Sequence, residues 1–84
     1  MNIEVEKSDL TKIGSTLYEE DGNTHIICDV QTANIEEILL RNVLRCFGQD
    51  YKILNAEDFE WENGDIGILF KTNLPFSMIH NQEE

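Results

Sequence analysis

The sequence predicts a small α+β fold in which an antiparallel four-stranded sheet carries one central helix on one face. An Asp-Gly pair at 21–22 and an Asn-Gly pair at 63–64 each lie between segments that alternate apolar and polar residues, which is typical of a β-hairpin. Between the two hairpins, residues 33–47 carry the apolar spacing of an amphipathic helix. The predicted order is therefore ββαββ, within a single domain of residues 1–84.

Both chain ends are expected to be flexible. Residues 1–12 combine a short alternation typical of an edge strand with the turn-like segment 7–9, so a fifth strand is an alternative there. At the other end, residues 80–84 are polar and follow the only proline, Pro75. The apolar segment 74–79, which contains Pro75, is expected to dock onto the sheet.

The first predicted hairpin covers residues 13–30. A type I′ turn at Asp21-Gly22 requires positive φ at both central residues and fixes the register of the strands that it joins. The resulting pairs are Ser15 with Cys28, Thr16 with Ile27, Leu17 with Ile26, Tyr18 with His25, and Glu19 with Thr24. Because both faces are partly apolar, we expect residues 24–30 to form a central strand.

The predicted helix covers residues 33–47. At about 100° per residue, one broad arc of its surface is apolar. This arc consists of Ile35, Leu39, Leu40, Val43, Leu44, Cys46 and Phe47. Glu37 and Arg41 lie on the opposite side, where an i, i+4 ion pair supports a solvated face. Asn34 is expected to cap the start of the helix, with Thr32 as an alternative.

The second predicted hairpin covers residues 51–72. A two-residue type I′ turn at Asn63-Gly64 would place Trp61 opposite Ile66, Phe59 opposite Ile68, and Glu57 opposite Phe70 on the core face. The reverse face would then carry Glu62 opposite Asp65, Glu60 opposite Gly67, and Asp58 opposite Leu69. This register predicts that Trp61 is a core residue.

The reverse face of this hairpin is unusually acidic. Asp58, Glu60 and Glu62 would form a row of carboxylates, and Asp65 would join them across the turn. Like charges opposite each other destabilise a hairpin, and the fold does not require them. In spacing and sign such a row resembles a stretch of phosphate backbone, which suits a groove built for nucleic acid. The alternative is a solvated strand whose charges protect a sheet edge.

A second acidic cluster lies at the tip of the first hairpin. Glu19, Glu20 and Asp21 are consecutive in the sequence, and acidic residues are common in turns. The cluster is a candidate for partner binding together with the acidic row, provided that both hairpin tips point the same way.

The overall charge indicates the kind of partner. Seventeen acidic residues against six basic ones give a formal net charge of −11. This charge argues against direct binding to nucleic acid or to an anionic membrane, and it favours encounter with a positively charged protein. Residues 1–4 lack the features of a signal peptide, and Cys28 and Cys46 lie among apolar neighbours, as buried free thiols do. We therefore expect a cytoplasmic protein.

The sequence contains no recognisable catalytic or metal-binding pattern. His25 and His80 are far apart, and the two cysteines do not form a close ligand pair. A solvated row of carboxylates cannot separate the pKa values of an acid and a base. We expect no catalytic residue and no cofactor.

In size, charge and mixed α/β build, the chain resembles the small acidic inhibitors of phages and mobile elements. These include uracil-DNA glycosylase inhibitors, anti-CRISPR proteins and restriction inhibitors. The resemblance implies an inhibitor that occupies the basic site of a nuclease, a CRISPR effector or another protein that binds DNA or RNA. The alternative is an immunity or antitoxin-like protein, or a small regulatory subunit, that recognises its partner by shape through Tyr18, Trp61 and Phe76. Self-repulsion favours a monomer, with a dimer as the alternative.

Overall fold

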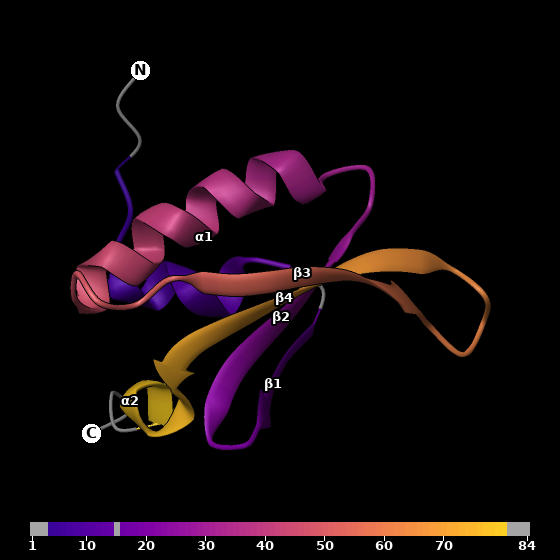
Figure 1. Ribbon diagram of the computed structural model, residues 1–84. Coiled ribbons are helices and arrows are strands. Elements are labelled where there is room, and N and C mark those ends of the chain that lie inside the picture. The colour runs from indigo at the N-terminus through magenta and orange to yellow at the C-terminus, as the bar shows by residue number, and fades with distance from the viewer. Residues whose placement is uncertain (1–3, 15, 81–84) are drawn as a thin grey trace.

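The computed structural model describes residues 4–14 and 16–80. The elements, in chain order, are the 3₁₀ helix η1 (Lys7–Lys12), strands β1 (Thr16–Glu20) and β2 (Asn23–Asp29), helix α1 (Ala33–Phe47), strands β3 (Ile53–Glu60) and β4 (Ile66–Pro75), and the short helix α2 (Phe76–His80). The strands form one antiparallel sheet in the order β1-β2-β4-β3, and α1 lies across one face of it (Figure 1). The predicted α+β fold with one main helix on a four-stranded sheet is confirmed.

The two chain ends contain more structure than we predicted. Residues 7–12 form η1, which packs against α1 and buries Leu10 to 1% exposure. A capping box between Glu6 and Asp9 starts this helix, and the Glu6 backbone N–H donates to Asp9 Oδ2 at 2.9 Å. The described residues before β1 therefore form no fifth strand. At the other end α2 follows β4 directly, while residues 81–84 lie outside the described residues.

The register of the first hairpin is confirmed. β1 and β2 pair Thr16 with Ile27, Leu17 with Ile26, Tyr18 with His25, and Glu19 with Thr24. The turn has positive φ at both Asp21 (57°) and Gly22 (84°), as type I′ geometry requires. The pair predicted for Ser15 lies outside the described residues. β2 also pairs with β4, so it is a central strand, as predicted.

Helix α1 has the predicted bounds, but its buried face is narrower than the predicted arc. Leu40, Val43 and Leu44 are at most 1% exposed, whereas Ile35 is 65% exposed and Cys46 is also exposed. Ile35 lies about 140° from Leu40 and about 180° from Leu44 around the helix axis, so it cannot share their contact with the sheet. Ile35 is therefore in the apolar arc of the sequence but not in the core, and the prediction that Cys46 is a buried thiol was wrong.

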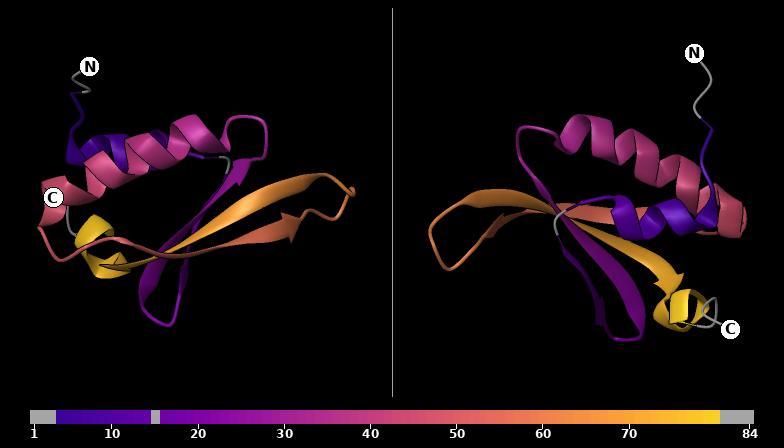
Figure 2. Two further views of the ribbon diagram at one scale, coloured as in Figure 1. Left: turned by 45° about the horizontal axis from the view of Figure 1, so that its top comes forward. Right: turned by 180° about the vertical axis from the view of Figure 1, so that it is seen from behind.

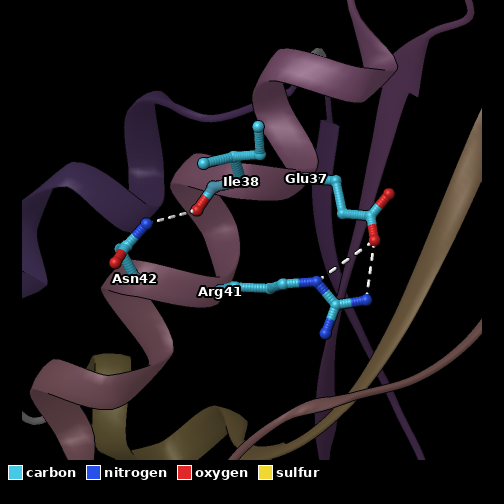
Figure 3. Close-up of polar contacts among 4 residues, drawn as sticks. All are labelled: Glu37, Ile38, Arg41 and Asn42. Carbon is cyan, nitrogen blue, oxygen red and sulfur yellow. Dashed lines mark hydrogen bonds and ion pairs between the residues drawn. The ribbon is translucent and has the colours of Figure 1, made fainter. Parts of the chain in front are cut away.

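The exposed side of α1 is held by polar contacts within the helix. Figure 3 shows the Arg41 guanidinium on the Glu37 carboxylate, with Nη2 at 2.6 Å and Nε at 3.1 Å from Oε2, and Asn42 Nδ2 donating to the Ile38 carbonyl at 2.8 Å. The helix starts after Thr32, whose hydroxyl donates to Glu36 Oε2 at 2.5 Å. Thr32 is the N-cap residue by position, but its side chain accepts no hydrogen bond from the first turn of the helix, and Asn34, the first choice from the sequence, lies inside the helix.

The register predicted for the second hairpin was wrong by one residue. β3 and β4 pair Glu57 with Leu69, Asp58 with Ile68, Phe59 with Gly67, and Glu60 with Ile66. The Trp61 N–H donates to the Asp65 carbonyl at 2.8 Å, which leaves a three-residue loop at 62–64. Gly64 alone of these three has positive φ (95°), and Asn63 Oδ1 accepts a hydrogen bond from the Asp65 N–H at 3.0 Å. The Asn side chain thus supports a longer turn than the predicted two-residue turn.

The shifted register changes which side chains share a face. Ile26 pairs with Phe70 and Cys28 with Ile68, and all four belong to the core beneath α1 or pack against it. We call the other side of the sheet the open face. Its residues include Thr16, Tyr18, His25, Ile27, Asp29, Asn55, Glu57, Phe59, Trp61, Gly67, Leu69 and Lys71. Trp61 and Phe59 therefore lie on the open face, half-buried and outside the main core, and the prediction of a core Trp61 was wrong.

The buried thiol of Cys28 predicts a loss of stability at alkaline pH. Burial, together with the nearby Glu36 carboxylate, raises the pKa of this thiol from 9.0 to about 12. Above pH 9 the unfolded chain releases the proton and the folded chain keeps it, so this stability is present below pH 9 and is lost progressively toward pH 12. We expect the free energy of unfolding to fall by about 1 kcal/mol from this group between pH 8 and pH 10.

The measurement is urea unfolding of the wild type and of Cys28→Ala at both pH values. The alanine variant lacks the thiol, so it should lose less stability than the wild type over this pH range. An equal loss in the two proteins would contradict the assignment to Cys28.

Candidate partner-binding surface

The hairpin formed by β3 and β4 projects from the body of the protein. Figures 1 and 2 show its turn, in orange, extending well beyond α1 and away from α2. Residues 62–66 are all exposed. The four acidic residues predicted for partner binding, Asp58, Glu60, Glu62 and Asp65, are all on this hairpin and are all exposed. A surface that contacts the projecting end of this hairpin therefore contacts carboxylates.

The four acids do not form the single row that the sequence predicted. Asp58 and Glu60 alternate along β3 and lie on the same face as α1, because they pair with Ile68 and Ile66. Same-face residues on a strand are about 6–7 Å apart. Asp65 lies opposite Trp61, not opposite Glu62, so the turn separates the acids into two groups.

The acidic cluster on the first hairpin lies at the other end of the sheet. Asn23, next to the first turn, pairs with Pro75 at the end of β4, whereas Glu60, near the second turn, pairs with Ile66 at its start. These two pairs are at opposite ends of the ten-residue strand β4, nine residue steps apart, which is about 30 Å at the rise of a strand. Figure 1 shows the two turns pointing in different directions. Glu19, Glu20 and Asp21 therefore do not join the surface around the second turn.

An open pocket beside the second turn combines an aromatic ring with acids. It has a volume of about 470 Å³ and is lined by Asp29, Trp61, Glu62, Asn63 and Asp65. Asp29 comes from the end of β2, where it pairs with Gly67. Sequence reasoning missed Asp29 because its place depends on the pairing of two strands that are distant in the chain.

The acids of the projecting hairpin have few partners within the protein. The ion pairs in residues 4–14 and 16–80 join Lys12 to Asp9, Arg41 to Glu37, and Lys71 to Glu57, and none of them includes the four predicted acids or Asp29. The Asp65 carboxylate accepts a hydrogen bond from Asn63 Nδ2 at 3.1 Å. These carboxylates remain available to cations from outside.

Two other charged residues on the open face, Lys71 and Glu57, form an ion pair with each other. Lys71 Nζ lies 3.0 Å from Glu57 Oε2, and the hydrogen bond and negative charge of Glu57 raise the pKa of Lys71.

Tyr18 contacts the ring of His25 at 5.6 Å between centroids, and burial, followed by the charge of Glu20, raises the pKa of the Tyr18 hydroxyl. Phe76 begins α2 and is bonded through its N–H to the Gly22 carbonyl, so it lies at the opposite end of the sheet from Trp61.

Neither a protein-family model, nor a curated protein, nor a solved structure matches the chain. In the described part of the chain, no three His, Cys, Asp or Glu side chains are placed to hold a metal ion, and no helix there is long and apolar enough to cross a membrane. The function must therefore be argued from the projecting hairpin itself.

Proposed function

We propose that this protein inhibits a nucleic-acid-binding enzyme by inserting its acidic hairpin into the basic site of that enzyme. The observation that carries the proposal is the projection of the β3–β4 hairpin beyond α1 with Asp58, Glu60, Glu62 and Asp65 exposed on it. None of these acids is in an ion pair with another described residue. The partner would be a basic protein such as a nuclease, a CRISPR effector or another DNA- or RNA-binding protein.

Two physical properties of the hairpin support this function. A paired two-stranded ribbon fixes the backbone from which these carboxylates project, so a partner has only their side chains to order on binding. Arginine and lysine side chains that normally hold phosphate groups bind carboxylates through the same charge-assisted hydrogen bonds. The net charge of −11 also speeds encounter with a basic partner. The split arrangement of the acids means that they would contact two sides of a groove.

A second candidate function is recognition by shape, as in an immunity or antitoxin-like protein or a regulatory subunit. It is favoured by the position of Trp61 and Phe59 on the open face, where aromatic side chains are available to a partner. The two functions differ in their response to salt. Mimicry of nucleic acid depends on exposed charges and weakens as salt screens them, whereas an apolar contact does not.

The test of the proposed function compares two variants of equal charge. The first neutralises the hairpin (Asp58→Asn, Glu60→Gln, Glu62→Gln, Asp65→Asn). The matched control neutralises four exposed acids at the other end of the sheet (Glu19→Gln, Glu20→Gln, Asp21→Asn, Asp50→Asn). Immobilised wild type is used to capture partners from a lysate of the source cells, and the captured proteins are identified and purified.

The proposal expects a captured nucleic-acid-binding enzyme that the wild type inhibits and that competitor DNA or RNA releases. The hairpin variant should bind about 100-fold more weakly, from a contribution of about 0.7 kcal/mol per carboxylate, while the control should stay within about threefold of the wild type. Raising salt from about 50 to 300 mM should weaken the wild type more than the hairpin variant. Equal binding by the hairpin variant, or a partner with no affinity for nucleic acid, would refute the proposal.

A further inference from the structure

We infer that the open face of the hairpin, around Trp61, receives an arginine side chain from the basic partner protein. This inference rests on the proposed function and specifies the chemistry of the partner. We call this region the Trp61 surface and define it by Phe59, Trp61, Asp29, Glu62 and Asp65. It lies on the opposite side of β3 from Asp58 and Glu60, so the two can be tested separately.

The indole of Trp61 lies across the sheet. A Cβ atom added to Gly67 would come within 2.5 Å of Cζ3 and 2.6 Å of Cη2 of the indole, and within 2.6 Å of the Cys28 carbonyl oxygen. The six-membered ring therefore packs directly against the backbone of Gly67. The Phe59 ring meets it edge to face, at 5.5 Å between centroids and 81° between planes. One side of the indole is fixed by these contacts, while the residue is only half-buried and lines the open pocket.

Three acidic residues line the same open pocket as this ring. Asp29, Glu62 and Asp65 line the same pocket as Trp61, and each of them is exposed. A cation over an indole face is attracted by the negative face of the ring, and tryptophan is the best of the aromatic side chains in this role. Guanidinium is planar, stacks on aromatic faces and donates in pairs to carboxylates, whereas the lysine ammonium is a strongly hydrated point charge. The combination of flat ring and acids therefore selects arginine.

The charge of the chain indicates which kind of protein would contact the Trp61 surface. Ile27 and Leu69 lie beside the Trp61 surface, at 4% and 7% exposure, and both are outside the main core. His25, on the same face, is 6% exposed, and its Nδ1 atom has no hydrogen-bond partner among the described residues. These three side chains are buried within the protein, so the Trp61 ring and the exposed acids around it are what this part of the face offers to a partner. A second copy of the chain would bring another charge of −11 to these acids, so charge complementarity requires a basic partner.

The test uses a capped peptide, acetyl-Arg-Gly-Arg-Gly-Arg-amide, as the probe. Trp61 is the only tryptophan in the chain, so its fluorescence reports occupancy of this surface directly. We expect a saturable change in emission with the arginine peptide. The same peptide with citrulline, which keeps the shape and removes the charge, should bind at least about tenfold more weakly, and the lysine peptide at least about threefold more weakly. Absence of saturable binding, or equal binding of the arginine and citrulline peptides, would overturn the inference.

Variants locate the binding site and separate this inference from the proposed function. Asp29→Asn should weaken the arginine peptide about five- to tenfold, and Trp61→Leu, followed by calorimetry, should weaken it by at least as much. Neither residue is in the main core, and a thermal melt checks that each variant is folded. Glu19→Gln/Glu20→Gln, at the other end of the sheet, is the control and should bind the peptide as the wild type does.

The two proposals have distinguishable failures. If the hairpin variant loses the captured enzyme but the wild type does not bind the arginine peptide, only the inference about Trp61 is wrong. If Asp29→Asn weakens the peptide while the four-acid hairpin variant keeps the enzyme, the proposed mimicry is wrong. Equal peptide binding by the wild type and Asp29→Asn would place the peptide elsewhere and would refute the inference.

Discussion

Replacing Gly67 by alanine is expected to lower the free energy of unfolding by about 3 kcal/mol, at the upper end of the range for an atom forced into a packed site. The new methyl group would overlap the Trp61 ring at 2.5 Å and the Cys28 carbonyl oxygen at 2.6 Å. Trp61 can rotate away, but the carbonyl belongs to the backbone of the neighbouring strand β2. The variant should therefore both destabilise the sheet and release the indole to solvent.

Urea unfolding and the emission maximum of Trp61 measure the two effects of Gly67→Ala. The emission maximum of the folded variant should shift to longer wavelength because the indole becomes more exposed. Comparison of Gly67→Ala in the wild type and in a Trp61→Leu background separates the ring overlap from the backbone overlap. A loss of stability below about 0.5 kcal/mol with an unchanged emission maximum would show that the indole does not pack on Gly67.

Leu40→Ala should cost about 2–5 kcal/mol of stability, and the matched change Ile35→Ala should cost less than about 0.5 kcal/mol. Both residues are on α1 and both lose a similar amount of apolar surface. Leu40 is 0% exposed in the core, whereas Ile35 is 65% exposed. Truncation of Leu40 leaves a cavity between the helix and the sheet, while truncation of Ile35 only shortens a side chain in water.

Chemical denaturation of these two variants tests which side of α1 faces the sheet. The apolar arc in the sequence contains both residues and does not separate them. If Ile35→Ala were as destabilising as Leu40→Ala, the helix would be rotated about its axis relative to the arrangement described above. Circular dichroism of each variant checks that α1 is still formed.

The two hairpins show how far local sequence determines register. In the first, Asp21 and Gly22 both adopt positive φ, so the dipeptide alone sets the pairing, and the prediction was correct for the described residues. In the second, Asn63 uses its side chain to accept the Asp65 N–H, and Gly64 alone takes positive φ. Both turn types are compatible with an Asn-Gly pair, and the choice between them moved each β3 side chain by one pairing position.

Contacts between distant parts of the chain could not be predicted from the sequence. Asp29 comes to the pocket only because β2 pairs with β4, and α1 exposes Ile35 because Leu40 and Leu44 determine its contact with the sheet. The position of the acids on the second hairpin was predictable from the alternation along β3. Whether they formed one row depended on the turn, and whether the first acidic cluster joined them depended on the strand order.

The strand order also has a consequence for how the chain folds. Each hairpin can form from neighbouring residues, but the sheet closes only when Cys28 meets Ile68 and Ile26 meets Phe70, which are 40 and 44 residues apart by their numbers. Long-range closure of this kind is the slow part of folding, because chain entropy must be lost before these contacts are made. The projecting turn at residues 62–64 lies outside the pairing of β2 with β4. Its sequence can therefore vary without slowing the step that completes the fold.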